Sequence, residues 1–193
     1  MQRYPILLIT LLLVVCTSCN RSKDTTTDNH YKFRKYISYT DTGRTSIASP
    51  IHVNLAKALS QYEIDQELPA TIFSISPKVK GTLSIKNQRN LIFTPDEQLD
   101  PDTEYSVSVQ LHKLYDDIPK ALNTFTFAFK TITPNFKVDI DQLQSYDKQW
   151  QYLEGQIETA DVISFKKAQE LINATQAGKA INIKWYTQEK ASN

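Results

Sequence analysis

Histidines are the side chains of this sequence best suited to bind a metal ion or to move a proton near neutral pH. His30, His52 and His112 are spread along the chain, and no two of them are four residues apart, the spacing that places two ligands on one helix face. Because metal ligands must converge on one point, this pattern does not predict a metal centre. We instead expect His30 in a polar tether, His52 on the polar face of a strand and His112 at a strand end.

Paired carboxylates are the next candidates, because two acids in one cleft can act as acid and base. Asp116 and Asp117 are adjacent, and Asp139 and Asp141 are separated by one residue. No neighbouring residue indicates a shifted pKa, which favours a solvated surface for both pairs. The sequence also has no Gly-x-Ser-x-Gly motif, no glycine-rich phosphate loop and no paired nucleophile and base. We therefore expect a protein that is not an enzyme and has no cofactor.

Aromatic residues and net charge give little support for a ligand surface. Trp150 and Trp185 could stack on a sugar ring, but each falls in a predicted strand, which favours a place in a core. The 22 basic and 21 acidic residues leave a net charge of +1, so there is no electrostatic reason to expect a nucleic-acid partner.

The two cysteines, Cys16 and Cys19, belong to an N-terminal segment that has the features of an export signal. In residues 1–18, Arg3 precedes an apolar run from Ile6 to Val15, which is shorter than the ~20 residues of a membrane-spanning helix. The rest of the chain has no cysteine, and hence no disulfide and no thiolate.

Cys19 follows the small residue Ser18 directly after this run and resembles the lipobox cysteine of bacterial lipoproteins, although Cys16 stands where the family usually has leucine. The resemblance implies a mature chain that begins at Cys19 and carries several acyl chains, enough for stable anchoring. We expect it in the bacterial cell envelope, anchored in the outer membrane, with the periplasmic or surface side left open. An ordinary secretory signal is the alternative.

Residues 19–32 are polar, rich in threonine and without periodicity, which predicts a flexible tether after the lipidated cysteine.

The clearest strand pattern of the sequence lies in Asn90–Leu111. There Tyr105, Val107, Val109 and Leu111 alternate with polar residues, as expected for a half-buried strand.

Tyr105 itself follows a proline-containing turn, the layout of a tyrosine corner, in which the hydroxyl bonds back to upstream backbone where the chain changes sheet. An ordinary core tyrosine after a plain turn is the alternative. Both interpretations predict an antiparallel sandwich.

The surrounding pattern predicts an Ig-like antiparallel β-sandwich over residues 33–133, with about seven strands. The expected elements are a first strand from Phe33 to Thr40 and a turn at Asp41–Arg44. Further strands are expected at Ile51–Leu55, Ile72–Ser76, Val79–Lys86, Asn90–Phe93 and Thr124–Lys130.

A boundary is expected near Pro134, because the pattern that follows is β-β-α-β. Strands are predicted at Phe136–Ile140, Trp150–Ile157 and Asn182–Tyr186. The helix is predicted at Asp161–Gln176, capped by Asp161 or Ser164, with Gly178 at its C-terminal end. A unit of this size buries little surface. We therefore expect residues 134–193 to be a domain that is cut short or is completed by another chain.

Several segments spread over nearly the whole chain share the pattern of one protein family. They are Ser49–Val53, Phe73–Gly81, Leu91–Asp96, Leu99–Val107, Gly155–Asp161 and Ile183–Trp185, in addition to the lipobox and tether. In combination they resemble the amino-terminal part of bacterial α2-macroglobulin-like lipoproteins. The strand motifs alone also occur in other bacterial Ig-like domains.

The resemblance implies a macroglobulin-type sandwich followed by the start of a second such domain. Members of this family inhibit proteases in the cell envelope: a bait segment is cut, the body collapses, and the protease is trapped, often through a Cys-Gln thioester. This chain has no cysteine after Cys19 and no bait segment, so trapping by this chain alone is excluded. What the resemblance implies is a membrane anchor and scaffold, with further C-terminal domains or another protein as partner. The alternative is a free-standing Ig-like surface lipoprotein that binds a glycan or a protein, for example by edge-strand pairing.

Overall fold

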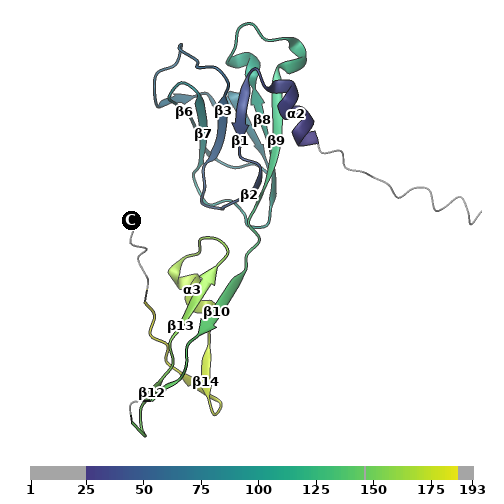
Figure 1. Cartoon of the computed structure of the whole chain (residues 1–193). Coiled ribbons are helices and arrows are strands. Elements are labelled where there is room, and N and C mark those ends of the chain that lie inside the picture. Colours follow the sequence, from purple (N-terminus) through teal and green to yellow (C-terminus); the bar gives the residue numbers. More distant parts are fainter. Residues whose placement is uncertain (1–24, 146, 187–193) are drawn as a thin grey trace, which may run out of the picture.

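The structure, a computed structural model, describes residues 25–145 and 147–186. The protein is mainly β, with a sandwich followed by a smaller unit of short strands and one helix (Figure 1). The chain passes from one to the other at residues 132–135, which include the predicted boundary at Pro134. Cys16, Cys19 and the predicted signal segment lie outside the described residues. Among the described residues, no helix has the length and apolar character needed to cross a membrane.

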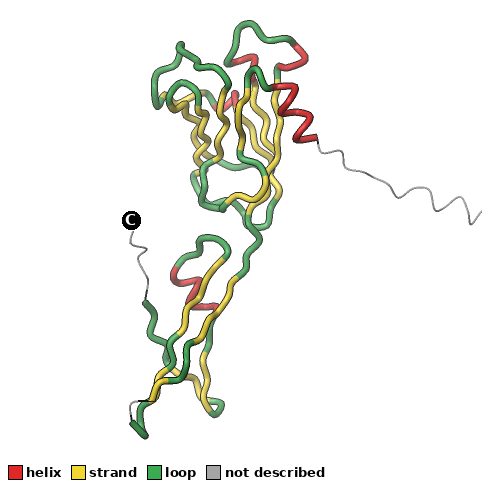
Figure 2. Tube along the Cα trace, viewed as in Figure 1, coloured by secondary structure: helices red, strands yellow, loops and turns green. Residues whose placement is uncertain are grey.

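Two sheets form the sandwich (Figure 2). The first is antiparallel and has the order β1 (Ile37–Thr40), β3 (Ile51–Leu55), β7 (Asn90–Pro95), β6 (Gly81–Lys86) and β4 (Gln66–Leu68). The second has the order β2 (Gly43–Thr45), β9 (Thr124–Thr131), β8 (Glu104–Gln110) and β5 (Phe73–Ser76). Only the β2–β9 pair of the second sheet is parallel.

The core lies between these sheets and follows from the alternation in the sequence. Tyr105 is opposite Phe129, Val107 opposite Phe127 and Val109 opposite Phe125 across the β8–β9 pair. All six side chains are buried, and residues of β3, β6 and β7 cover them from the other sheet. Burial of each such side chain contributes about 1.5–3 kcal/mol. The strand predictions for β3, β8 and β9 are confirmed, as is the β6–β7 hairpin.

Tyr105 stands where the chain leaves the first sheet at the end of β7 and enters the second at β8. Its side chain is 1% exposed, and its hydroxyl accepts a hydrogen bond from the backbone N–H of Asp100 at 3.0 Å. This is the upstream contact that the corner interpretation predicts. Thr131 holds the same loop, because its hydroxyl donates to the Asp100 carbonyl at 2.7 Å and accepts from the Thr103 N–H at 2.8 Å.

The beginning of the sandwich differs from the prediction. Residues Thr25–Phe33 form helix α2 instead of the end of a tether and the start of a strand, and β1 begins only at Ile37. Phe33 is buried against the edge of the Phe125 ring, with centroids 5.2 Å apart. Threonine, aspartate and asparagine are modest helix formers, so contacts with the sandwich override weak local propensity here.

Two strands of the sandwich, β2 and β4, were not predicted. Gly43 takes the positive φ expected of the Asp41–Arg44 turn (+83°), but the chain continues into β2 and so changes sheet. The 56–68 segment ends in β4. The remaining short elements are 3-10 turns at Ala70–Ile72, Leu111–Lys113 and Lys120–Leu122. With these strands, the described sandwich has nine strands rather than about seven.

The described residues of the smaller unit form three antiparallel strand pairs and one helix. The pairs are β10 (Phe136–Ile140) with β13 (Gly155–Thr159), β11 (Gln144–Ser145) with β12 (Gln151–Tyr152), and β14 (Ala174–Gln176) with β15 (Lys179–Ile181). Helix α3 (Phe165–Leu171) lies between β13 and β14 in the chain. The predicted strand at Phe136–Ile140 is confirmed, whereas the one at Trp150–Ile157 is interrupted between β12 and β13.

The predicted helix at Asp161–Gln176 is too long at both ends. Ser164 is its N-cap and accepts a hydrogen bond from the Lys167 N–H at 3.2 Å. Ile172 is already extended, because the chain turns back into the β14–β15 hairpin. Ala177 and Gly178 take positive φ in that hairpin turn, so Gly178 is not a helix end. Residues 182–186, expected as a strand, form no regular element.

Candidate functional site

The three histidines each have a different partner and do not converge. The His30 Nε2 lies 3.0 Å from the Thr40 hydroxyl, and the His112 Nδ1 lies 3.3 Å from the Asn123 carbonyl oxygen. His52 pairs with Asp41 on the polar side of β3. Within residues 25–145 and 147–186, no group of three potential metal ligands is found.

The carboxylate pairs and the tryptophans are also separate. Asp116 and Asp117 lie in the loop after the Leu111–Lys113 turn, whereas Asp139 lies in β10 and forms an ion pair with Lys137 at 2.7 Å. Trp150 is 74% exposed, so its predicted place in a core is wrong. Trp185 is partly buried and packs edge-to-face on Phe165, with centroids 6.4 Å apart.

Asp41 lies in the turn that the sequence predicts at Asp41–Arg44, and its carboxylate has several polar partners. One of its carboxylate oxygens accepts from the His52 backbone N–H at 2.7 Å and lies 2.9 Å from His52 Nδ1. The other accepts from the Tyr39 hydroxyl at 3.2 Å. The charge of Asp41, and then its hydrogen bond, raises the pKa of Tyr39. The β1–β3 pairing brings these residues together, and no spacing rule would have found it.

An open, shallow cavity of about 280 Å³ adjoins this cluster, and its lining is mostly polar, with Arg44, Ser46 and Ser49 among its residues. Because the carboxylate fixes the Nδ1 side of the His52 ring, the ring is well oriented. Among the described residues, however, no hydroxyl is hydrogen-bonded to Nε2 of His52, which a nucleophile–base pair requires. We therefore assign Asp41 to holding the ends of β1 and β3 together.

A second carboxylate joins the two units. Asp161 accepts hydrogen bonds from the Ser46 hydroxyl, from the Ile47 N–H at 2.8 Å and from the Val162 N–H at 2.8 Å. Partial burial raises the pKa of Asp161, but the hydrogen bonds from Ser46, Ile47 and Val162 outweigh it and leave the pKa below its usual value. The sequence predicts Asp161 or Ser164 as the helix cap. Ser164 is the cap, and Asp161 instead binds a turn of the sandwich across the unit boundary.

The smaller unit carries an apolar surface that remains open. Phe136, Val138 and Ile140 alternate along β10 and are 45%, 38% and 63% exposed. Since alternate residues of a strand point the same way, the three share one face. Other large apolar side chains of this unit are also exposed, namely Leu143, Trp150, Tyr152, Leu153, Val162, Ile163, Phe165, Ile181 and Tyr186. Among described residues 134–186, none is buried. We call Phe136, Val138 and Ile140 the β10 apolar face.

No protein-family model matches the chain, and no curated protein matches it.

Proposed function

We propose that the chain is a non-enzymatic, membrane-anchored scaffold. In this proposal lipid on Cys19 holds it in the cell envelope, and the sandwich connects that anchor to the body of an α2-macroglobulin-like protease inhibitor. Residues 134–193 are the start of the second macroglobulin-type domain. The observation that carries the proposal is the β10 apolar face, which is open in a protein whose other unit is densely packed.

Packing energetics supports this assignment. Full burial of a large apolar side chain contributes about 1.5–3 kcal/mol, and that contribution is only partly realised across the smaller unit. Two-stranded hairpins are marginally stable on their own, whereas three or more strands with a covered apolar face are stable. A further β layer laid on the β10 apolar face supplies both the missing burial and the missing strands.

The junction suits a scaffold as well. Asp161 bonds to Ser46 and Ile47 in the sandwich, and the Arg44 guanidinium donates to the Thr133 hydroxyl at 3.4 Å. These contacts give the smaller unit a defined attachment to the sandwich. A spacer that presents the next domain in a fixed direction requires such a defined attachment between its units.

One observation favours the alternative of a free-standing surface lipoprotein that binds a glycan. Trp150 is exposed, and an exposed indole can stack on a sugar ring. The genomic DNA downstream of the Asn193 codon separates the two proposals. A continuation that encodes further sandwich domains and a Cys-Gln motif supports the scaffold, whereas an unrelated gene supports the free-standing lipoprotein.

Acylation tests the anchor directly. In cells labelled with radioactive palmitate, the full chain should carry label and sediment with membranes. Cys19→Ala should lose the label and Cys16→Ala should keep it, because only Cys19 follows a small residue. Label retained on Cys19→Ala, or lost only on Cys16→Ala, would show that the anchor is assigned wrongly.

A further inference from the structure

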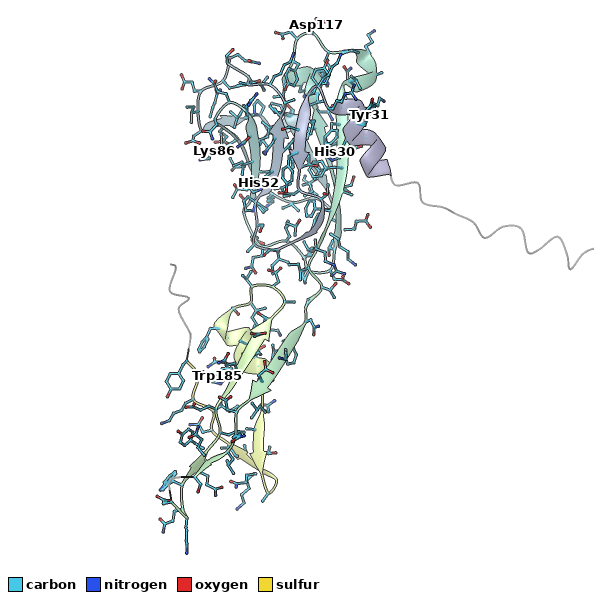
Figure 3. All side chains as sticks on the ribbon, viewed as in Figure 1. His30, Tyr31, His52, Lys86, Asp117 and Trp185 are labelled. Atoms are coloured by element: carbon cyan, nitrogen blue, oxygen red, sulfur yellow. The ribbon has the colours of Figure 1, made fainter. Side chains whose placement is uncertain are left out.

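Helix α2 has an inner side that is fixed to the sandwich. The Asn29 amide donates to the Thr126 carbonyl of β9 at 2.7 Å, and His30 contacts the Thr40 hydroxyl of β1. Phe33, at the end of the helix, is 2% exposed. Figure 1 shows α2 lying along β9, and Figure 3 labels His30 on it. These contacts determine which side chains of the helix face away from the protein.

Exposed basic and aromatic side chains lie at the end of α2 and in the turn that follows it, which includes Arg34 and Lys35. Tyr31 is 69% exposed, and Lys32, Arg34 and Lys35 are exposed as well. The Arg34 guanidinium lies over the Tyr31 ring, 4.2 Å from its centroid. None of the three cations has an ion-pair partner among the described residues. We call Tyr31, Lys32, Arg34 and Lys35 the α2 basic patch.

We propose that the α2 basic patch binds the anionic phospholipid headgroups of the membrane that holds the anchor. This inference rests on the proposed function, because Cys19 places the patch beside a bilayer. The chain from Cys19 to the start of α2 reaches at most about 20 Å, at about 3.3–3.6 Å per residue, and the helix from Thr25 to Lys32 adds roughly 10 Å at about 1.5 Å per residue. The patch therefore stays within reach of the headgroups.

The chemistry of the patch matches that surface. Arginine binds phosphate oxygens through two parallel hydrogen bonds, and lysine adds a compact positive charge. Tyrosine has an apolar ring and a polar tip, which suits the boundary between headgroups and water. Basic residues next to a membrane anchor are attracted to anionic lipid, and each contributes a factor of about five in partitioning. Three cations in four residues contrast with a net charge of +1 for the chain.

Binding to the headgroups has a structural consequence. Because α2 is bonded to β1 and β9, contact between the patch and the bilayer fixes the orientation of the whole sandwich on the membrane. A lipid chain alone would tether the protein without orienting it. The α2 basic patch thus gives the lipid-anchored protein a defined orientation on the membrane.

Vesicle flotation of residues 20–193, produced without lipid, tests the patch apart from the anchor. The protein should bind vesicles of phosphatidylglycerol and phosphatidylcholine, should not bind phosphatidylcholine alone, and should dissociate at high salt. The triple variant K32Q/R34Q/K35Q should bind the anionic vesicles about 100-fold more weakly. The matched variant K78Q/K80Q/K166Q removes the same charge from exposed lysines elsewhere and should lose less than about threefold.

Several outcomes would overturn the inference: no binding to anionic vesicles, equal binding to both kinds of vesicle, or equal losses in the two triple variants. All substituted side chains are exposed, so circular dichroism should show that both variants fold. The palmitate experiment on Cys19 is independent of this one. If Cys19 carries no lipid but the unlipidated chain binds anionic vesicles through Lys32, Arg34 and Lys35, the proposal of a lipid anchor is rejected and the proposal of headgroup binding is retained. If Cys19 carries lipid but the unlipidated chain does not bind anionic vesicles, the lipid anchor is retained and headgroup binding is rejected.

Discussion

Tyr105 shows how a single hydroxyl stabilises the passage between two sheets. Removing it with Tyr105→Phe leaves the Asp100 N–H without its acceptor at a partly buried contact, in a loop whose Asp100, Pro101 and Asp102 are exposed. Loss of a typical hydrogen bond costs about 0.5–1.5 kcal/mol, so the free energy of unfolding in urea should fall by that amount. Tyr39→Phe is the control, because the Tyr39 hydroxyl is on an exposed side chain, and should change stability by less than about 0.5 kcal/mol. Similar losses in both variants would contradict the role given to the corner.

Local sequence chemistry accounts for some of these residue roles but not for others. The turn before Tyr105 and its place ahead of an alternating strand are both visible within a few residues. The Asp41–His52 contact depends on the pairing of β1 with β3, and the Asp161–Ser46 contact joins residues 115 positions apart. Such contacts are set by tertiary structure, and a single sequence carries no direct signal for them.

At the scale of elements, α2 is a part of the sandwich rather than of the tether. Phe33→Ala removes a large side chain that packs on Phe125, and loss of its burial together with the cavity left behind should lower the free energy of unfolding by about 3–5 kcal/mol. Tyr31→Ala on the exposed side of the same helix should cost less than about 1 kcal/mol. Urea unfolding measures both. Equal, small effects would mean that α2 is not docked on β9.

The elements predicted correctly are those in which one signal dominates. Strict alternation marks β8, β9 and β10, and a polar turn at Asn87–Asn90 marks the β6–β7 hairpin. The misses fall where local signals are weak or compete. Helix α2 has few good helix formers, and β2 has only three residues. The helix predicted at Asp161–Gln176 is longer than α3 (Phe165–Leu171), because the chain is extended from Ile172 and turns at Ala177–Gly178 into the β14–β15 hairpin.

At the scale of the molecule, Asp161 is the residue whose loss should most affect how the units are joined. Asp161→Ala removes the acceptor for the Ser46 hydroxyl and the Ile47 N–H, so the smaller unit should move more freely. Because the two units lie end to end (Figure 1), bent arrangements then become accessible, and the radius of gyration from X-ray scattering should decrease. Asp139→Ala is the control, because Asp139 pairs only with Lys137 of its own strand among the described residues. An unchanged scattering profile for Asp161→Ala would show that other contacts fix the junction.

The same contact should depend on pH. The pKa of Asp161 is lowered in the folded protein, so the carboxylate contributes stability that is present above its unfolded pKa of about 3.9 and is lost as the pH falls through the lowered value. Scattering of the unsubstituted chain should therefore be constant from pH 8 to pH 5. In more acidic solution it should approach that of Asp161→Ala.

The two units differ in how completely they are packed, and this difference underlies the scaffold proposal. The sandwich encloses one core that includes residues from Phe33 to Phe129, whereas the described part of the smaller unit buries no residue and leaves most of its large apolar side chains exposed. A unit of this kind gains most of its stability from the layer that packs on its apolar face. The protein is therefore expected to be a stable spacer that ends in a surface for assembly.

Amide hydrogen exchange on the chain from residue 20 measures this difference most directly. Amides in β3, β7, β8 and β9 should exchange only through global unfolding, while amides in β10 and β13 should exchange orders of magnitude faster through local opening. Equal protection in the two groups of strands would contradict the account, because the smaller unit would then be a complete domain that needs no covering layer.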